Sequence, residues 1–117
     1  MSNFAGFLRD RRESLKRGDP AFSIRRVAER IGIEPSYLSK IERGVEAPPS
    51  ERTIVKLAED LGENPDVMLA LAGKVSTDLQ EVIRKRPQLF AQLLRQLKNA
   101  PERAVLRIVR EVRDGDW

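Results

Sequence analysis

Apolar residues recur at intervals of three and four along almost the whole chain, and Gly, Pro, Asn and Ser separate these segments. This spacing predicts amphipathic helices, because residues three or four apart share a helix face, whereas half-buried strands alternate. The first segment ends by Gly18. Its apolar face comprises Phe4, Phe7, Leu8 and Leu15. The pattern predicts an all-α protein.

A second, short helix is expected to follow Ser23, because serine is a favoured N-cap residue. Phe22 precedes the cap and Val27 occupies the fourth helical position, so the two are placed to form a hydrophobic staple. Gly32 then supplies the left-handed residue that commonly follows a helix. The buried stripe of this helix is expected to comprise Val27, Ala28 and Ile31.

A third helix is predicted from Pro35 to Gly44, since proline at the first helical position loses no intrahelical hydrogen bond. In this register Leu38 and Ile41 face the interior. The opposite, polar face comprises Pro35, Ser36, Ser39, Lys40 and Arg43.

Two further helices are expected to complete a small domain over residues 1–73. Ser50 caps the first of them and Gly62 closes it. Its apolar stripe comprises Ile54, Leu57, Ala58 and Leu61. The second begins at Asn64 and Pro65 and ends at Gly73. Its apolar residues are Val67, Met68 and Leu71.

Residues 76–117 are predicted to form a separate C-terminal element of three helices, after a short hinge at residues 73–76. The last two helices, from Pro87 to Lys98 and from Pro101 to about Arg113, are strongly amphipathic. We expect their apolar stripes to pack within or between subunits. The residues expected to form a dimer contact are Leu89, Phe90, Leu93, Leu94, Leu97, Val105, Ile108, Val109 and Val112. Trp117 is expected to dock in a pocket, because an exposed terminal aromatic gains nothing.

The distribution of charge supports this division. The net charge is +4 over 117 residues. Residues 1–44 hold ten Lys or Arg against six Asp or Glu, residues 45–75 hold three against six, and residues 76–117 hold nine against six. A basic surface permits binding to nucleic acid without establishing it.

Composition excludes several classes of function. The chain has no Cys and no His, so disulfides, thiolate metal sites and histidine general bases are absent, and we expect neither a metal nor another cofactor. No paired carboxylates in a recognisable setting and no Gly-rich phosphate loop can be identified, so an enzyme is not expected. No apolar run is long enough to span a membrane, and charges interrupt the N-terminal residues, so we expect a cytoplasmic protein.

The segment from Ser23 to Gly44 resembles the Cro and phage-repressor family of helix-turn-helix domains, the XRE family. The shared features are a small Ala28 at the helix crossing, Gly32 in the turn and a characteristic third helix. The run that carries most of the likeness is Tyr37-Leu38-Ser39-Lys40-Ile41-Glu42-Arg43-Gly44. The resemblance continues through the Pro48-Pro49 turn and covers residues 4–72. It implies a regulator that binds a double-stranded DNA operator in the major groove.

The resemblance also implies roles for single residues. Those expected to face base edges are Pro35, Ser36, Ser39 and Lys40. Those expected to contact phosphates are Tyr37 and Arg43, with the backbone N–H groups from Ser23 to Arg25. Many family members carry a phosphate-binding Gln where this chain has Ile24, and Arg25 or Arg26 is expected to take its place. Arg12 and Glu42 are expected to form a structural salt bridge.

Plainer interpretations stay open at this point. Arg25, Arg26 and Arg30 are also typical of a solvated helix face, and Tyr37 of a residue that covers the edge of the core. The leading functional hypothesis is a dimeric repressor. The alternative is an antitoxin-type or peptidase-linked interaction protein, whose C-terminal helices bind a partner protein.

Overall fold

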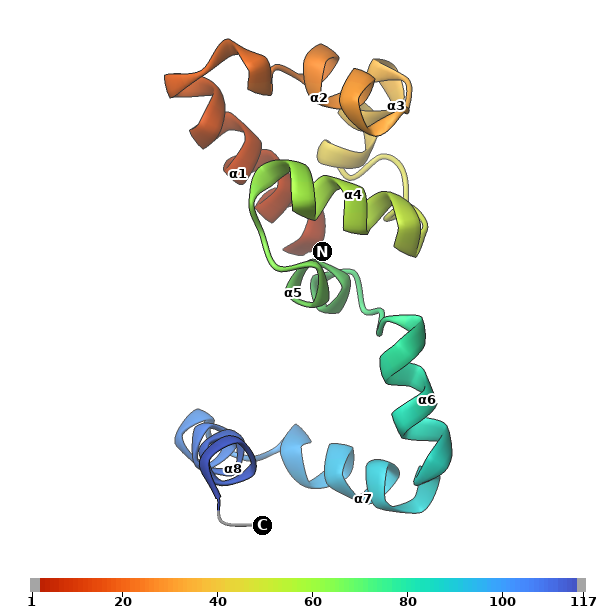
Figure 1. The fold of residues 1–117 in the computed structure, drawn as a ribbon, viewed down its shortest axis with the longest axis vertical. Helices are drawn as coiled ribbons and strands as arrows, with labels where there is room; N and C mark the ends of the chain where they lie inside the picture. The colour runs from red at the N-terminus through yellow and green to blue at the C-terminus, as the bar shows by residue number, and fades with distance from the viewer. Residues whose placement is uncertain (1–2, 116–117) are drawn as a thin grey trace. The chain divides into compact units, whose positions relative to one another are not determined.

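The computed structural model of the chain describes residues 3–115, so the expectation for Trp117 lies outside the described residues. These residues form α-helices and one short 3₁₀ helix, with no strand among them. The elements are α1 (Asn3–Gly18), η1 (Pro20–Phe22), α2 (Ile24–Ile31), α3 (Pro35–Glu42), α4 (Glu51–Leu61), α5 (Pro65–Leu71), α6 (Thr77–Lys85), α7 (Pro87–Lys98) and α8 (Glu102–Asp114) (Figure 1). The prediction of an all-α protein is confirmed.

The chain divides between Ser76 and Thr77 into two compact units. We refer to residues 1–76 as the N-terminal unit and to residues 77–117 as the C-terminal unit.

Capping residues set the ends of the helices in the N-terminal unit. The Ser23 Oγ accepts a hydrogen bond from the Arg26 amide at 3.3 Å, so it satisfies one of the free N–H groups at the start of α2. Gly32 follows α2 with φ of 79°, a left-handed conformation that glycine adopts without strain. Its amide and that of Ile33 donate to the Ala28 carbonyl, which ends α2 and turns the chain towards α3.

The ends of α4 and α5 are built in the same way. The Ser50 Oγ accepts from the Thr53 amide at 3.4 Å, and the Asn64 Oδ1 accepts from the amides of Asp66 and Val67 at 2.8 and 3.3 Å. Asp19 caps η1, a one-turn helix that the sequence pattern did not predict. The caps expected at Ser23 and Ser50 are therefore confirmed, and Asn64, where the next helix was expected to begin, is its N-cap.

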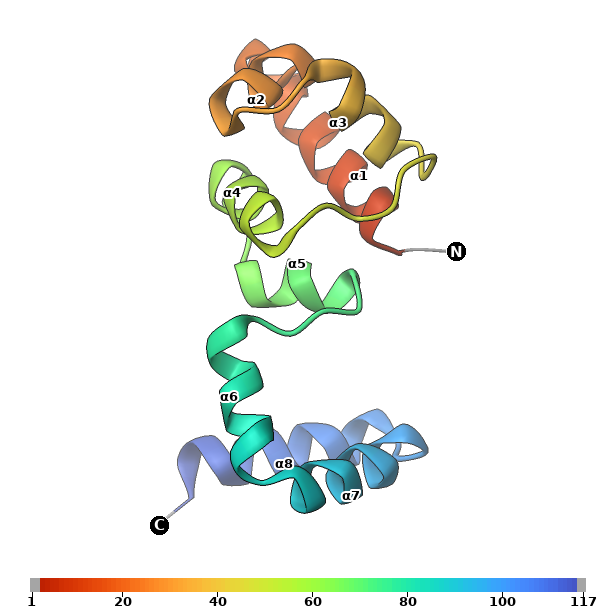
Figure 2. The same ribbon diagram turned by 90° about the vertical axis from the view of Figure 1, so that its right-hand side faces the viewer.

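One hydrophobic core holds the N-terminal unit together. Helix α1 packs against α3, α4 and α5, and α2 packs against α3 and α4. The buried apolar residues are Phe4, Leu8, Val27, Ala28, Ile31, Leu38, Ile41, Ile54, Leu57, Ala58, Leu61, Met68 and Leu69. In both ribbon views α2 and α3 lie at the end of this unit opposite α5 (Figures 1 and 2). The pair is thus presented at the surface by a rigid support.

The expected apolar face of α5 is wrong in one respect. Met68 is buried, but Val67 is 50% exposed and Leu69 takes its place in the core. Met68, Leu69, Leu71 and Ala72 lie in or against the core where α5 meets α1 and α4, so the expected placement of Leu71 is also confirmed. Val67 lies outside this cluster.

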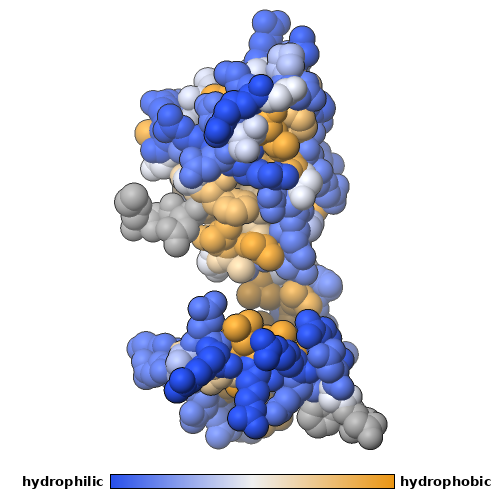
Figure 3. Space-filling view, turned by 90° about the vertical axis from the view of Figure 1, so that its left-hand side faces the viewer, coloured by the Kyte–Doolittle hydropathy of each residue, from blue (hydrophilic) through white to orange (hydrophobic). Residues whose placement is uncertain are grey.

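The C-terminal unit has a different character. Helix α6 packs against α7. None of residues 77–115 is buried, although many are large and apolar. Apolar surface on this unit is bordered by hydrophilic residues (Figure 3).

Candidate nucleic-acid interface

Helices α2 and α3 are joined by a tight turn and pack against each other. Ala28 of α2 is fully buried, and a side chain of its small size lets two helix axes approach closely. Leu38 and Ile41 of α3 are buried on the opposite side of the contact. The α2–α3 unit is therefore anchored by its inner faces and leaves the outer face of α3 available.

The outer face of α3 carries the residues expected to face DNA bases. Ser36 and Lys40 are exposed, whereas Pro35 and Ser39 are half-buried. All four fall within about 140° around the helix axis, because they are spaced by one, three and four positions. Arg43, the residue that follows α3, is exposed and continues the same side. The structure thus groups these residues on one face, as the sequence pattern predicts.

The cations around this face differ in how firmly they are held. Arg26, Lys40 and Arg43 are exposed and have no ion-pair partner among residues 3–115. Arg25 is exposed and lies 3.3 Å from Glu29 in an i,i+4 pair. Such an exposed pair is weak, so Arg25 remains available to an anion.

Ser23 and Tyr37 have structural duties of their own. The Ser23 hydroxyl caps α2, and the amides of Ile24 and Arg25 have no acceptor among the described residues. Tyr37 is half-buried and packs against the core, which supports the interpretation that it covers the core edge.

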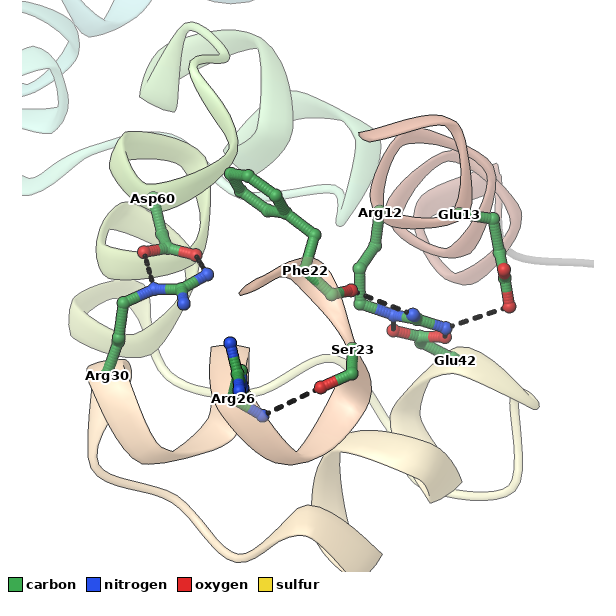
Figure 4. Close-up of polar contacts among 8 residues, drawn as sticks. All are labelled: Arg12, Glu13, Phe22, Ser23, Arg26, Arg30, Glu42 and Asp60. Atoms are coloured by element: carbon green, nitrogen blue, oxygen red, sulfur yellow. Dashed lines mark hydrogen bonds and ion pairs between the residues drawn. The ribbon is translucent and has the colours of Figure 1, made fainter. Parts of the chain in front are cut away.

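A buried ion pair connects α1 to α3. Arg12 donates from Nε and Nη2 to the two Glu42 carboxylate oxygens at 2.6 and 2.8 Å, and from Nη1 to the Phe22 carbonyl at 3.1 Å (Figure 4). Arg12 is 2% and Glu42 5% exposed. The hydrogen bond to Glu42 raises the pKa of Arg12 above its usual value, although burial acts in the opposite direction. The expected salt bridge is present, and it ties α3 to α1.

Arg30 is exposed, but several contacts hold its guanidinium in place. It donates to both carboxylate oxygens of Asp60 at 2.7 and 3.0 Å and to the Ala21 carbonyl at 2.6 Å. Its guanidinium also lies 5.1 Å from the centre of the Phe22 ring (Figure 4). These contacts join α2 to α4 and η1. No local pattern could have predicted the pair with Asp60, since the two residues are 30 positions apart.

Residues 3–115 contain no group of His, Cys, Asp or Glu side chains that could hold a metal ion. Within the same range, no helix has the length and apolar character required to cross a membrane.

The anchored α2, the turn at Gly32 and the exposed α3 together define a helix-turn-helix unit. The family described as Helix-turn-helix matches residues 8–68, which include α2, α3 and their support. The chain belongs to this family, the Cro/C1-type helix-turn-helix regulators of the XRE group, and is a DNA-binding transcription regulator. No curated protein and no solved structure shows a significant match to the chain.

Proposed function

We propose that this protein binds double-stranded DNA in a sequence-specific way, with α3 in the major groove. The observation that carries the proposal is the outer face of α3, where polar side chains lie opposite the buried Leu38 and Ile41. The major groove is about 12 Å wide and admits a single helix. Unpaired cations at Arg26, Lys40 and Arg43 surround this face, as a polyanionic ligand requires.

The chemistry of each side chain suggests its role. The Lys40 ammonium is suited to guanine O6 and N7, and the Ser36 and Ser39 hydroxyls donate or accept with little discrimination. Pro35 offers apolar contact, for example to a thymine methyl group. These four residues are the proposed base contacts.

Phosphate contacts fix the register of α3 in the groove. We assign them to Ser23, Arg25, Arg26, Tyr37 and Arg43. At Ser23 the contact would come from backbone N–H groups near the start of α2, where the amides of Ile24 and Arg25 have no acceptor among the described residues.

We further propose that the regulator is a homodimer joined by its C-terminal unit. Residues 77–115 bury no side chain, so their apolar surface lacks a core of its own. An apolar groove of about 380 Å³ lies between α7 and α8. Its lining comprises Leu93, Leu97, Val105, Ile108, Val109, Val112 and the edge residue Arg113.

The three remaining residues proposed for the dimer contact, Leu89, Phe90 and Leu94, do not line this groove. Leu89 and Leu94 are 63% and 59% exposed, and Phe90 is half-buried. A second copy covering both the groove and these residues would give each subunit the core it lacks. The two linked N-terminal units would then reach operator half-sites one helical turn apart, and the dimer would act as a repressor.

The same exposed apolar surface favours one alternative, an antitoxin-type or peptidase-linked protein whose C-terminal helices bind a partner protein. In either case the proposed role of the N-terminal unit in DNA binding is the same. We also propose that the protein is cytoplasmic and has no enzymatic activity.

Sequencing genomic DNA that co-purifies with the tagged protein tests the function directly. The expected result is a small set of enriched sites that share a two-fold-symmetric motif. Purified protein should then bind this motif at least 10³-fold more tightly than random DNA at physiological salt. Equal binding to both DNAs would contradict specific recognition. Light scattering of the full chain tests the proposed homodimer, because it separates a dimer from a monomer.

A further inference from the structure

A hollow of about 180 Å³ lies where α1, the start of α2 and α3 meet. Arg9 of α1 and Arg43 after α3 line it together with Ile24 and Ser39. The buried pair Arg12–Glu42 and the neighbouring Glu13 complete its lining. At about 30 Å³ per water molecule, the hollow has room for a tetrahedral phosphate with a few waters.

The charges in this hollow favour an anion. Arg12 and Glu42 neutralise each other, and the Arg12 Nη2 also lies 3.1 Å from a Glu13 carboxylate oxygen. Arg9 and Arg43 are exposed and have no ion-pair partner among residues 3–115. Three guanidinium groups against two carboxylates leave the lining with one excess positive charge.

The location of the hollow indicates where its anion comes from. Ser39 lines the hollow and also belongs to the outer face of α3. A helix in the major groove has a phosphate backbone along each side of it. The hollow therefore lies where a strand of the DNA backbone would pass if α3 reads the groove.

We propose that this hollow binds one phosphate of the DNA backbone and that Arg9 is a DNA-binding residue. Arg9 and Arg43 donate charge-assisted hydrogen bonds to the phosphate oxygens from two sides. The Arg12–Glu42 pair keeps α1 at the distance from α3 that both contacts require. The first helix thus helps to position α3 on DNA. This inference rests on the DNA-binding function proposed above.

The variant Arg9→Gln tests the proposal, with Arg17→Gln as the matched control. Both residues are exposed cations of α1, and the control lies about 12 Å further along the helix, outside the hollow. We expect Arg9→Gln to weaken binding to operator and to random DNA about tenfold. The slope of the logarithm of the binding constant against the logarithm of the salt concentration should become shallower by about 0.9, which corresponds to one phosphate contact. Arg17→Gln should change both quantities much less, and neither variant should alter the melting temperature.

A second measurement identifies the phosphate itself. Single phosphates of the operator are replaced in turn by uncharged methylphosphonates, and binding of the native protein and of Arg9→Gln is compared. One replacement should weaken the native protein about tenfold more than it weakens Arg9→Gln, in which only Arg43 still contacts that phosphate. The proposal is overturned if no position behaves in this way, or if Arg17→Gln loses as much affinity as Arg9→Gln. Failure of the native chain to bind any DNA would instead reject the proposed function itself.

Discussion

Arg12 of α1 and Glu42 of α3 form a two-point ion pair that is almost completely removed from solvent. The same guanidinium donates to the Phe22 carbonyl immediately before the α2 N-cap. A single side chain therefore joins α1 to both helices of the helix-turn-helix. This arrangement makes the orientation of α3 depend on α1, although the two residues are 30 positions apart.

Removal of either partner of this pair should destabilise the protein strongly. Arg12→Met leaves the Glu42 carboxylate buried without its cation, and Glu42→Leu leaves the Arg12 guanidinium buried without its anion. We expect each change to lower the free energy of unfolding by about 3–5 kcal/mol, measured by urea denaturation. The double variant should be more stable than either single variant, since it leaves no uncompensated charge. Single variants within about 0.5 kcal/mol of the native protein would contradict this role.

Ala28→Leu should destabilise the N-terminal unit. Ala28 is fully buried where α2 packs on its neighbours, so the larger side chain cannot be accommodated without moving a helix. We expect a loss of about 1–3 kcal/mol and a lower melting temperature in circular dichroism. Ala70→Leu adds the same atoms at an exposed position of α5 and serves as the control. Equal melting temperatures for the two variants would refute the placement of the helix crossing at Ala28.

Lys40→Ala and Arg43→Ala should affect binding in different ways. Loss of a base contact at Lys40 should weaken operator binding by about 1–3 kcal/mol and leave random DNA nearly unchanged. Loss of a phosphate contact at Arg43 should weaken both DNAs by a similar factor. Fluorescence anisotropy on the two DNAs at one salt concentration measures the contrast. If Lys40→Ala weakens both DNAs equally, its assignment as a base contact is wrong.

Truncation after Ser76 should leave a folded monomer. This boundary keeps Lys74, whose ammonium donates to the Pro49 carbonyl at 2.9 Å and ties the segment after α5 to the start of α4. We expect native-like melting, a monomer in light scattering and an operator affinity roughly a hundredfold lower or worse, because two linked heads gain from avidity. A truncated protein that still dimerises and binds normally would move the dimer contact into the N-terminal unit.

Val109→Glu should prevent dimerisation of the full chain, because it places a charge in the apolar groove between α7 and α8. Leu106→Glu is the matched control on the same helix. Leu106 is 46% exposed, close to the 50% of Val109, but does not line the groove. Sedimentation should show a monomer for Val109→Glu and a dimer for Leu106→Glu. A dimer in both cases would exclude the groove as the contact between subunits.

Much of the fold was predictable because the signals involved are local. The caps at Ser23, Ser50 and Asn64 and the left-handed Gly32 act on residues within four positions, and helical periodicity is read over similar distances. The outer face of α3 was predictable for the same reason. Its residues share one helix, so their common orientation follows from their spacing.

The sequence by itself thus determined which segments are α-helices, where most of them end and which side of α3 is polar. The tertiary structure decided what depends on contact between distant segments. Arg30 binds Asp60, Leu69 rather than Val67 enters the core, and Arg9 meets Arg43 around one hollow. Periodicity shows that a helix has an apolar side, but the packing of α1, α2 and α4 selects the residues that meet there. Tertiary packing brings together side chains that are far apart in the sequence, and no local spacing encodes those encounters.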